Sequence, residues 1–224
     1  MTIEQITYAI INDVEAGLVG LHENITLSED QVSDEVVAER ERIILEWWKK
    51  GILQKGDLQT AINCIQVDCK DPTKCCTSPI GKSELHFEIP QLVNGIGEDA
   101  IVWVGSADRK QQYRVYFTPT QLKYHKYKRR VSNRPYVYIE CTPNENGMYD
   151  GWIYNLPFVK TIAVIGIFRD PRQLEKIGCD GNCDNSNGDF GSLSAEVKDR
   201  LTKQKLYYYR QALQPPHRND QTAR

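Results

Sequence analysis

Residues 136–168 read YVYIECTPNENGMYDGWIYNLPFVKTIAVIGIF, and this stretch decides the fold class of the chain. It holds three runs of β-branched and aromatic residues, 136–141, 148–154 and 161–168, each of which predicts a strand. Asn144-Glu-Asn-Gly147 lies between the first two runs and predicts a hairpin turn. The stretch therefore predicts an antiparallel sheet.

Three more runs of the same kind extend this sheet toward the N-terminus. They are residues 61–67, 100–105 and 112–117. Ser106-Ala-Asp-Arg-Lys110 predicts the turn between the last two, and an antiparallel meander is the expected order. One short helix interrupts it, with Thr118 as the cap, Pro119 at its first position and Gln121 at its third.

Two helices precede the strands and one follows them. The first begins after Thr2, which forms a capping box with Gln5, and its apolar residues recur three to four positions apart. The second begins near Ser28 and ends at Gly51. The last covers residues 194–213, where two prolines stop it.

The pattern thus predicts an α+β protein with an N-terminal helical pair, a mostly antiparallel β-domain, and a C-terminal helix with an extended tail. We place an acidic helical hairpin at residues 1–52 and the antiparallel β-domain, with its short basic helix, at 53–177. A loop, the C-terminal helix and the tail occupy residues 178–224.

The composition is that of an ordinary globular chain. Its 224 residues include 28 Lys+Arg and 30 Asp+Glu, for a net charge of −2. No apolar run reaches the roughly 18–20 residues that a bilayer span needs, so we expect no membrane partner. Residues 1–5 do not resemble the start of a signal peptide, so we expect synthesis in the cytoplasm, with the seven cysteines as thiols.

Charge is distributed unevenly along the chain. Residues 1–46 carry eleven acids and only Arg40 and Arg42 as bases, whereas residues 109–134 carry nine bases and no acid. Opposite potentials on two surfaces favour association with copies of the same chain or with charged partners. The alternative is two solvated faces that differ in charge.

Motifs for catalysis are absent from the sequence, so we predict neither enzymatic activity nor a cofactor. Gly95-Ile-Gly97-Glu-Asp-Ala100 matches a dinucleotide-binding pattern in letters, but a strand follows where the phosphate-binding helix should begin. Residues 180–188 resemble the start of a calcium loop yet lack its central glycine and its final glutamate. The four histidines, which are widely separated, are expected at the surface.

A zinc site is the weaker interpretation of the cysteines. Its candidate ligands are Cys64, Cys69, Cys75 and Cys76. The two-residue spacing of a zinc knuckle is missing, and Cys64 lies in a predicted strand where a thiol can be buried as a small apolar group. We therefore predict no metal.

Two sets of residues are candidates for an interface. Adjacent aromatic residues cannot all face one core, which makes anchors of Trp47, Trp48, Tyr207, Tyr208 and Tyr209. The second set interleaves bases with aromatic residues and consists of Lys123, Lys126, Lys128, Arg129 and Arg130. Such a run can contact nucleic acid, but a pI near 6.1 argues against a dedicated nucleic-acid-binding protein.

The order of segments carries a resemblance. A capped helix at residues 2–14 precedes Cys64-Ile-Gln-Val-Asp-Cys69, Cys75-Cys76, Lys82-Ser83 and Ile89-Pro90. Val102-Trp-Val-Gly-Ser-Ala-Asp108 and Ile162-Ala-Val-Ile-Gly-Ile-Phe-Arg-Asp-Pro171 follow. Over roughly residues 1–172 the chain resembles virion structural proteins of crAss-like tailed bacteriophages, similar to the ring proteins that join the portal to the tail.

The resemblance implies a non-enzymatic structural protein in the neck or tail of the virion. It implies roughly a dozen copies in a ring around the genome channel. The implied partners are copies of itself, the portal, other neck or tail proteins and, in passing, genomic DNA. A metal-binding or nucleic-acid-binding accessory protein is the alternative function.

Overall fold

The computed structural model describes residues 1–18, 27–53, 58–70, 84–125, 134–156, 159–177 and 193–212. Contacts divide the chain into two compact units. The helical unit comprises residues 1–43 and 190–224, and the β unit comprises residues 44–189. Together they form an α+β fold with antiparallel sheets, which confirms the predicted fold class.

In its described residues the helical unit contains three helices, and each starts and stops where local signals predict. They are α1 (Ile3–Gly17), α2 (Glu29–Lys49) and α4 (Ser194–Ala212), and the part of α2 up to Ile43 belongs to this unit. The backbone N–H of Gln5 donates to Thr2 Oγ1, and Gln5 Oε1 accepts from the Thr2 backbone N–H, so the predicted capping box is present. α1 buries Ile6, Ile10 and Val14 completely.

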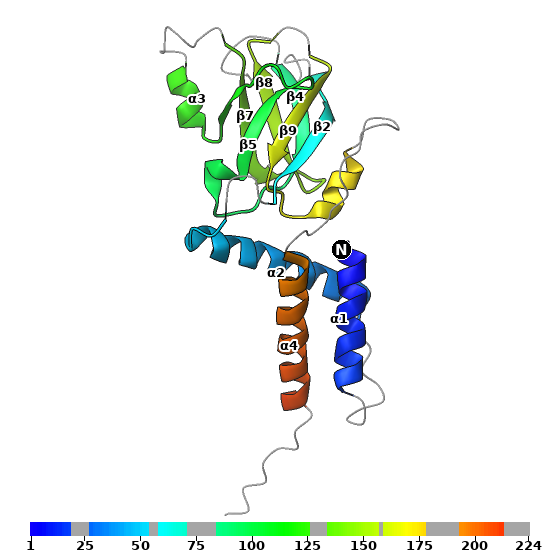
Figure 1. The fold of residues 1–224 in the computed structure, drawn as a ribbon. Helices are drawn as coiled ribbons and strands as arrows, with labels where there is room; N and C mark the ends of the chain where they lie inside the picture. The colour runs from blue at the N-terminus through cyan, green and yellow to red at the C-terminus, as the bar shows by residue number, and fades with distance from the viewer. Residues whose placement is uncertain are drawn as a thin grey trace, which may run out of the picture. The chain divides into compact units, whose positions relative to one another are not determined.

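α4 lies beside α1, although almost the whole chain separates them in sequence (Figure 1). A Cβ atom on Gly17 would lie 2.7 Å from Leu206 Cδ2, which shows how closely the two helices approach there. Val197 and Leu201 of α4 are buried in the same unit. The segment boundaries predicted from sequence separate the C-terminal helix from the helical pair, whereas these helices pack as one unit.

The described strands of the β unit form two sheets. The three-stranded sheet has the order β2-β9-β5, and its strands are β2 (Thr60–Gln66), β9 (Thr161–Gly166) and β5 (Ile101–Ser106). The five-stranded sheet has the order β3-β4-β8-β7-β6, and its strands are β3 (Asp68–Lys70), β4 (Glu84–Pro90), β8 (Met148–Tyr154), β7 (Tyr136–Pro143) and β6 (Arg114–Tyr116). β2 and β4 contact each other across the two sheets.

The predicted meander is wrong. β9 lies between β2 and β5, and it pairs antiparallel with both. Its residues Ile162, Ala163 and Val164 are fully buried in succession, which is typical of a central strand whose two faces are both covered. The central position of β9 in its sheet is therefore determined by burial of both its faces, and not by its order along the chain.

β6 pairs parallel with β7, the one parallel pair among the described strands. Parallel neighbours need a crossover connection, and α3 (Pro119–His125) lies in that connection. Its Leu122 packs against Tyr116, Tyr136 and Tyr154 on the outer face of the five-stranded sheet. The predicted short helix is therefore present, with Gln121 N–H donating to Thr118 Oγ1 as the cap predicts.

β3 and β4 are two strands that the sequence pattern did not predict. β4 pairs with β8 over six residues, and its Leu85, Phe87 and Ile89 face the core. Polar residues alternate with these in the sequence, namely Glu84, His86 and Glu88. They lower the mean hydropathy of the segment, as is typical of a loop. The alternation of apolar residues at every second position was the signal that could have found it.

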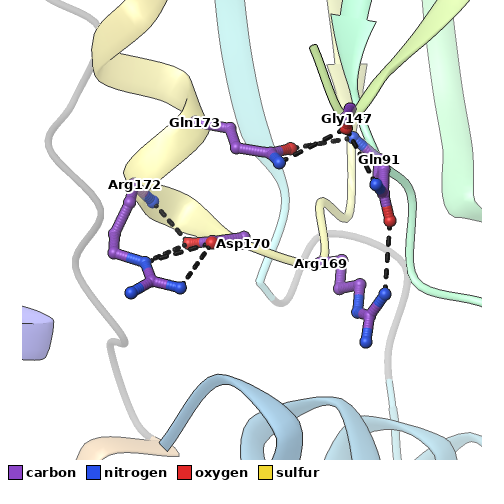
Figure 2. Close-up of polar contacts among 6 residues, drawn as sticks. All are labelled: Gln91, Gly147, Arg169, Asp170, Arg172 and Gln173. Carbon is purple, nitrogen blue, oxygen red and sulfur yellow. Dashed lines mark hydrogen bonds and ion pairs between the residues drawn. The ribbon is translucent and has the colours of Figure 1, made fainter. Parts of the chain in front are cut away.

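A hydrogen-bonded cluster fastens the ends of these strands together (Figure 2). Gln91 follows β4, and its Nε2 donates to the carbonyl of Gly147 at 2.8 Å, in the predicted hairpin turn. Gln173, in the short helix η2 (Pro171–Lys176), accepts from the Gln91 backbone N–H at 3.2 Å. Arg169 Nη1 donates to Gln91 Oε1 at 3.2 Å, so one glutamine joins three segments.

Candidate interaction surfaces

The last turns of α4 present the most exposed tyrosines of the helical unit apart from Tyr8. Tyr207 and Tyr208 are 65% and 66% exposed, respectively, whereas Tyr209 is half-buried. Tyr208 and Tyr209 meet edge to face at 5.5 Å, and Gln211 Nε2 donates to Tyr207 Oη at 2.6 Å. These contacts hold the rings in place while their faces stay open to solvent. Tyrosines held in this way are suited to anchor a partner.

Trp47 and Trp48 lie at the C-terminal end of α2 and are both half-buried. The helix ends as predicted at Gly51, whose φ is +67°, with Gly51 N–H donating to the Trp48 carbonyl and Ile52 N–H to that of Trp47. This end leaves Ile52 55% exposed. Part of the tryptophan surface is thus used within the chain.

Trp48 also lines a hollow on the β unit. The other lining residues are Leu53, Gln59, Asp99, Ile101, Val102 and Ile167. Most of these are apolar, and Val102 is 40% exposed on β5. Asp99 is exposed and is the one acidic residue among those that line the hollow. The structure therefore places one predicted anchor in a mostly apolar groove, which we call the Trp48 groove.

Acids of the N-terminal segment pair with bases of α4. Lys198 Nζ lies 2.8 Å from Asp13 Oδ2 on α1, and Lys205 Nζ lies 2.6 Å from Glu35 Oε2 on α2. Arg200 Nη1 lies 3.7 Å from Glu39 Oε1, whose side chain is only 6% exposed. Part of the acidic character of residues 1–46 is thus neutralised inside the chain, while Glu4, Glu15, Glu29 and Asp30 remain exposed.

Most of the predicted basic surface lies outside the described residues. Lys126, Lys128, Arg129 and Arg130 fall there, and the backbone of Lys123 is described as part of α3 without its side chain. Arg114 and Arg134 are exposed, and the Arg114 guanidinium lies 5.5 Å from the centre of the Tyr116 ring. Burial raises the pKa of Tyr116, and Arg114 partly offsets this rise. The described part of the basic segment is thus a cationic surface over an aromatic cluster.

The cysteines do not form a described metal site. Cys64 is disulfide-bonded, so the expectation that every cysteine is a thiol is wrong at this position. The side chain of Cys69 and residues Cys75 and Cys76 lie outside the described part of the chain. Among the described residues no cluster of His, Cys, Asp and Glu could hold a metal ion. The calcium-like loop at residues 180–188 is also outside the described ranges.

Cys141 is a free and exposed thiol at the end of β7. Partial shielding and the neighbouring carboxylate of Glu140 raise its pKa. A neutral thiol is a poor nucleophile. Cys141 therefore lacks the activation expected of a catalytic cysteine.

His86 is buried, so the expectation of surface histidines fails for this residue. Its side chain is 4% exposed, and Nε2 lies 2.7 Å from Asp150 Oδ1. Trp152 packs against the imidazole edge to face at 5.7 Å. Asn144 Nδ2 donates to Glu88 at 3.1 Å and lies 3.4 Å from Asp150. The histidine belongs to a polar row on the outer face of the five-stranded sheet.

None of the helices in the described ranges has the length and apolar character needed to cross a membrane. A family model described as phage tail ring protein 2 matches residues 5–196. No curated protein matches the chain. Because the family model covers most of the sequence, the chain belongs to the phage tail ring protein 2 family, whose members are structural components of the phage virion.

Proposed function

We propose that this protein is a non-enzymatic ring component that joins the portal to the tail in the phage neck and surrounds the channel through which the genome passes. The match to the tail ring family over residues 5–196 is the observation that carries the proposal. The portal, the other neck or tail proteins and, in passing, genomic DNA are the proposed partners. We further propose that the protein is made in the host cytoplasm and binds neither metal nor cofactor.

A closed ring needs a heterologous contact, in which one surface of each copy meets a different surface of the next. The described residues offer surfaces of different character. α4 exposes tyrosines, the β unit carries the Trp48 groove, and Arg114 and Arg134 are exposed within the basic segment. We assign the interface to the predicted anchors and bases, namely Trp47, Trp48, Tyr207, Tyr208, Tyr209, Lys123, Lys126, Lys128, Arg129 and Arg130.

The native mass of the purified protein tests this function, measured alone and after mixing with the portal of the same phage. We expect a closed ring of roughly a dozen copies, either alone or on the portal only. Images of the large species should show a central channel. A monomer in both samples would refute the proposal and lead back to metal and DNA binding.

Charge reversal tests whether the basic surface contributes to ring formation, as distinct from a general effect of net charge. We expect a variant with Glu at Lys126, Lys128, Arg129 and Arg130 to form fewer rings, because four attractive contacts become repulsive. Lys203→Glu is the control for charge reversal on another surface, since Lys203 is 73% exposed on α4 and pairs with Asp199 on the same helix. Equal ring formation by both variants would remove the basic segment from the interface.

The segment after Leu213 is proposed to reach a neighbouring copy or partner. A chain that ends at Ala212 keeps all of α4 and therefore its packing against α1. We expect the shortened chain to assemble less well while its helices keep their protection from hydrogen exchange. Unchanged assembly would refute this role for the tail.

A further inference from the structure

We propose that the tyrosine end of α4 in one copy docks in the Trp48 groove of the next copy. This pairing rests on the proposed ring and specifies which two surfaces close it. The helix side consists of Tyr207, Tyr208 and Arg210, and the groove side of Trp48, Val102 and Asp99. The two sides are different surfaces, as a heterologous contact requires, and they belong to different units of the chain.

The apolar parts of the two surfaces match in chemistry. Tyr207 and Tyr208 present rings that are about two-thirds exposed, and Val102 is 40% exposed beside Trp48 in the groove. Aromatic rings inserted between aliphatic and indole side chains are the most frequent anchors of protein contacts. The groove is lined by apolar residues together with Gln59 and Asp99, which suits a phenol ring that buries its body and leaves its hydroxyl near a polar group.

The charges also match. Arg210 follows the tyrosines directly, and its side chain is exposed. Asp99 lines the groove, and Glu98 precedes it at the start of the 3₁₀ turn η1 (Gly97–Ala100). Arg210 beside the inserted rings and Asp99 in the groove are complementary in charge, and this pair favours docking of α4 over docking of an acidic partner, whereas Glu98 is hydrogen-bonded to Gln121.

The helix side is partly organised before docking. Gln211 holds the Tyr207 hydroxyl, and Tyr209 packs against Tyr208. Side chains that are already held lose less conformational freedom on binding. In a ring, this smaller loss of conformational entropy applies at every interface between copies.

A mixing experiment tests the pairing. One variant, Tyr207→Ser with Tyr208→Ser, keeps the groove but lacks the anchors. The other, Val102→Lys, keeps the anchors but places a cation in the groove where Arg210 should approach. We expect each variant alone to be monomeric, with the contact weakened about 30-fold or more, as for loss of an interface hot spot.

Mixed together, the two variants retain one intact helix side and one intact groove. We expect them to form a one-to-one heterodimer that cannot grow, which native mass spectrometry identifies from the mass difference between the variants. Tyr8→Ser is the matched control, because Tyr8 is 66% exposed on α1 and lies outside the proposed pair. It should form rings like the unmodified protein.

A charge exchange gives a second test. Arg210→Glu and Asp99→Arg should each reduce ring formation, and the two changes in one chain should restore it. All comparisons use the condition, alone or on the portal, in which the unmodified protein forms rings. Rings in both single-surface variants, or a mixture that stays monomeric, would overturn the pairing. Failure of the unmodified protein to form rings in either condition would instead overturn the proposed ring function.

Discussion

The helical unit and the β unit join their elements by different interactions. α4 meets α1 and α2 through apolar packing together with three ion pairs that bridge helices, at 2.6–3.7 Å. The strands of the β unit meet through backbone ladders and through aromatic contacts such as Tyr136 against Tyr154 at 4.9 Å. A helix satisfies its backbone internally and a strand does not. The packing of a helix against its neighbours therefore depends on side chains, whereas backbone hydrogen bonds also hold a strand to its neighbouring strands.

The largest effect that this comparison predicts is in the β unit. Phe87 is 1% exposed, and its ring lies over Gly151, its partner across β4 and β8. We expect Phe87→Ala to lower the free energy of unfolding by about 3–5 kcal/mol, because it leaves a cavity in the core. Chemical denaturation gives the size, and hydrogen exchange should show faster opening of β4 and β8.

Gly151→Ala tests the same contact from the partner strand β8. A Cβ atom there would lie 2.3 Å from Phe87 Cζ, so we expect the single change to cost about 1–3 kcal/mol through overpacking. The clash disappears when Phe87 is also Ala. The double variant should therefore be more stable than the sum of the two single effects predicts. Additive effects would contradict the ring position described here.

An intermediate effect is expected in the helical unit. Glu39 is buried and contacts Arg42 at 2.8 Å as well as Arg200 at 3.7 Å. We expect Glu39→Gln to cost about 1–2 kcal/mol, because two cations lose a charged partner. Thermal unfolding and hydrogen exchange of α4 measure the effect.

Asp199→Asn is the matched control for this ion pair. Asp199 pairs with Lys203 on the same helix, and both side chains are mostly exposed. Its loss should change stability by less than about 0.5 kcal/mol. If both variants lose the same stability, the pairs between helices contribute no more than a surface pair does.

The smallest effect is a dependence on alkaline pH that is confined to the β unit. Burial raises the pKa of Tyr113, Tyr116 and Tyr138 above the ordinary value of 10.0. Between this value and the raised one, the folded protein keeps protons that the unfolded chain releases. Stability is therefore fully present below about pH 9 and falls as the pH rises through 10 and beyond.

Denaturation curves between about pH 8 and 11 measure this fall. Tyr116→Phe removes one of the titrating groups, so it should make the pH dependence shallower. A variant whose stability falls with pH as steeply as that of the unmodified protein would contradict a contribution from Tyr116.

Several local features could be predicted because neighbouring residues alone decide them. The capping box at Thr2, the helix end at Gly51, the hairpin turn at Asn144–Gly147 and the bounds of β8 all follow the sequence prediction. The family and the fold class were predicted correctly as well. The exposure of Tyr207 and Tyr208 could also be predicted, since three adjacent tyrosines on a helix cannot all be buried.

Other features required the tertiary structure. The disulfide at Cys64 and the burial of His86 depend on residues that come together only on folding. β4 alternates apolar with polar residues, and its pairing with β8 identifies it as a strand. The Trp48 groove combines the end of α2 with η1, β5 and Ile167. Only Trp48 among its residues was marked by the sequence, as one of two adjacent tryptophans, so no local pattern brings the groove residues together.

The sequence by itself determined the four helices, the hairpin turn at Asn144–Gly147 and most of the strands among the described residues, since capping, turn geometry and hydrophobic periodicity act over a few residues. Only the tertiary structure decided that β9 lies between β2 and β5 and that α4 packs beside α1. These choices depend on which apolar faces and charges meet across long separations in the chain. Many pairings are compatible with the same local signals, and the packing of the whole unit selects among them.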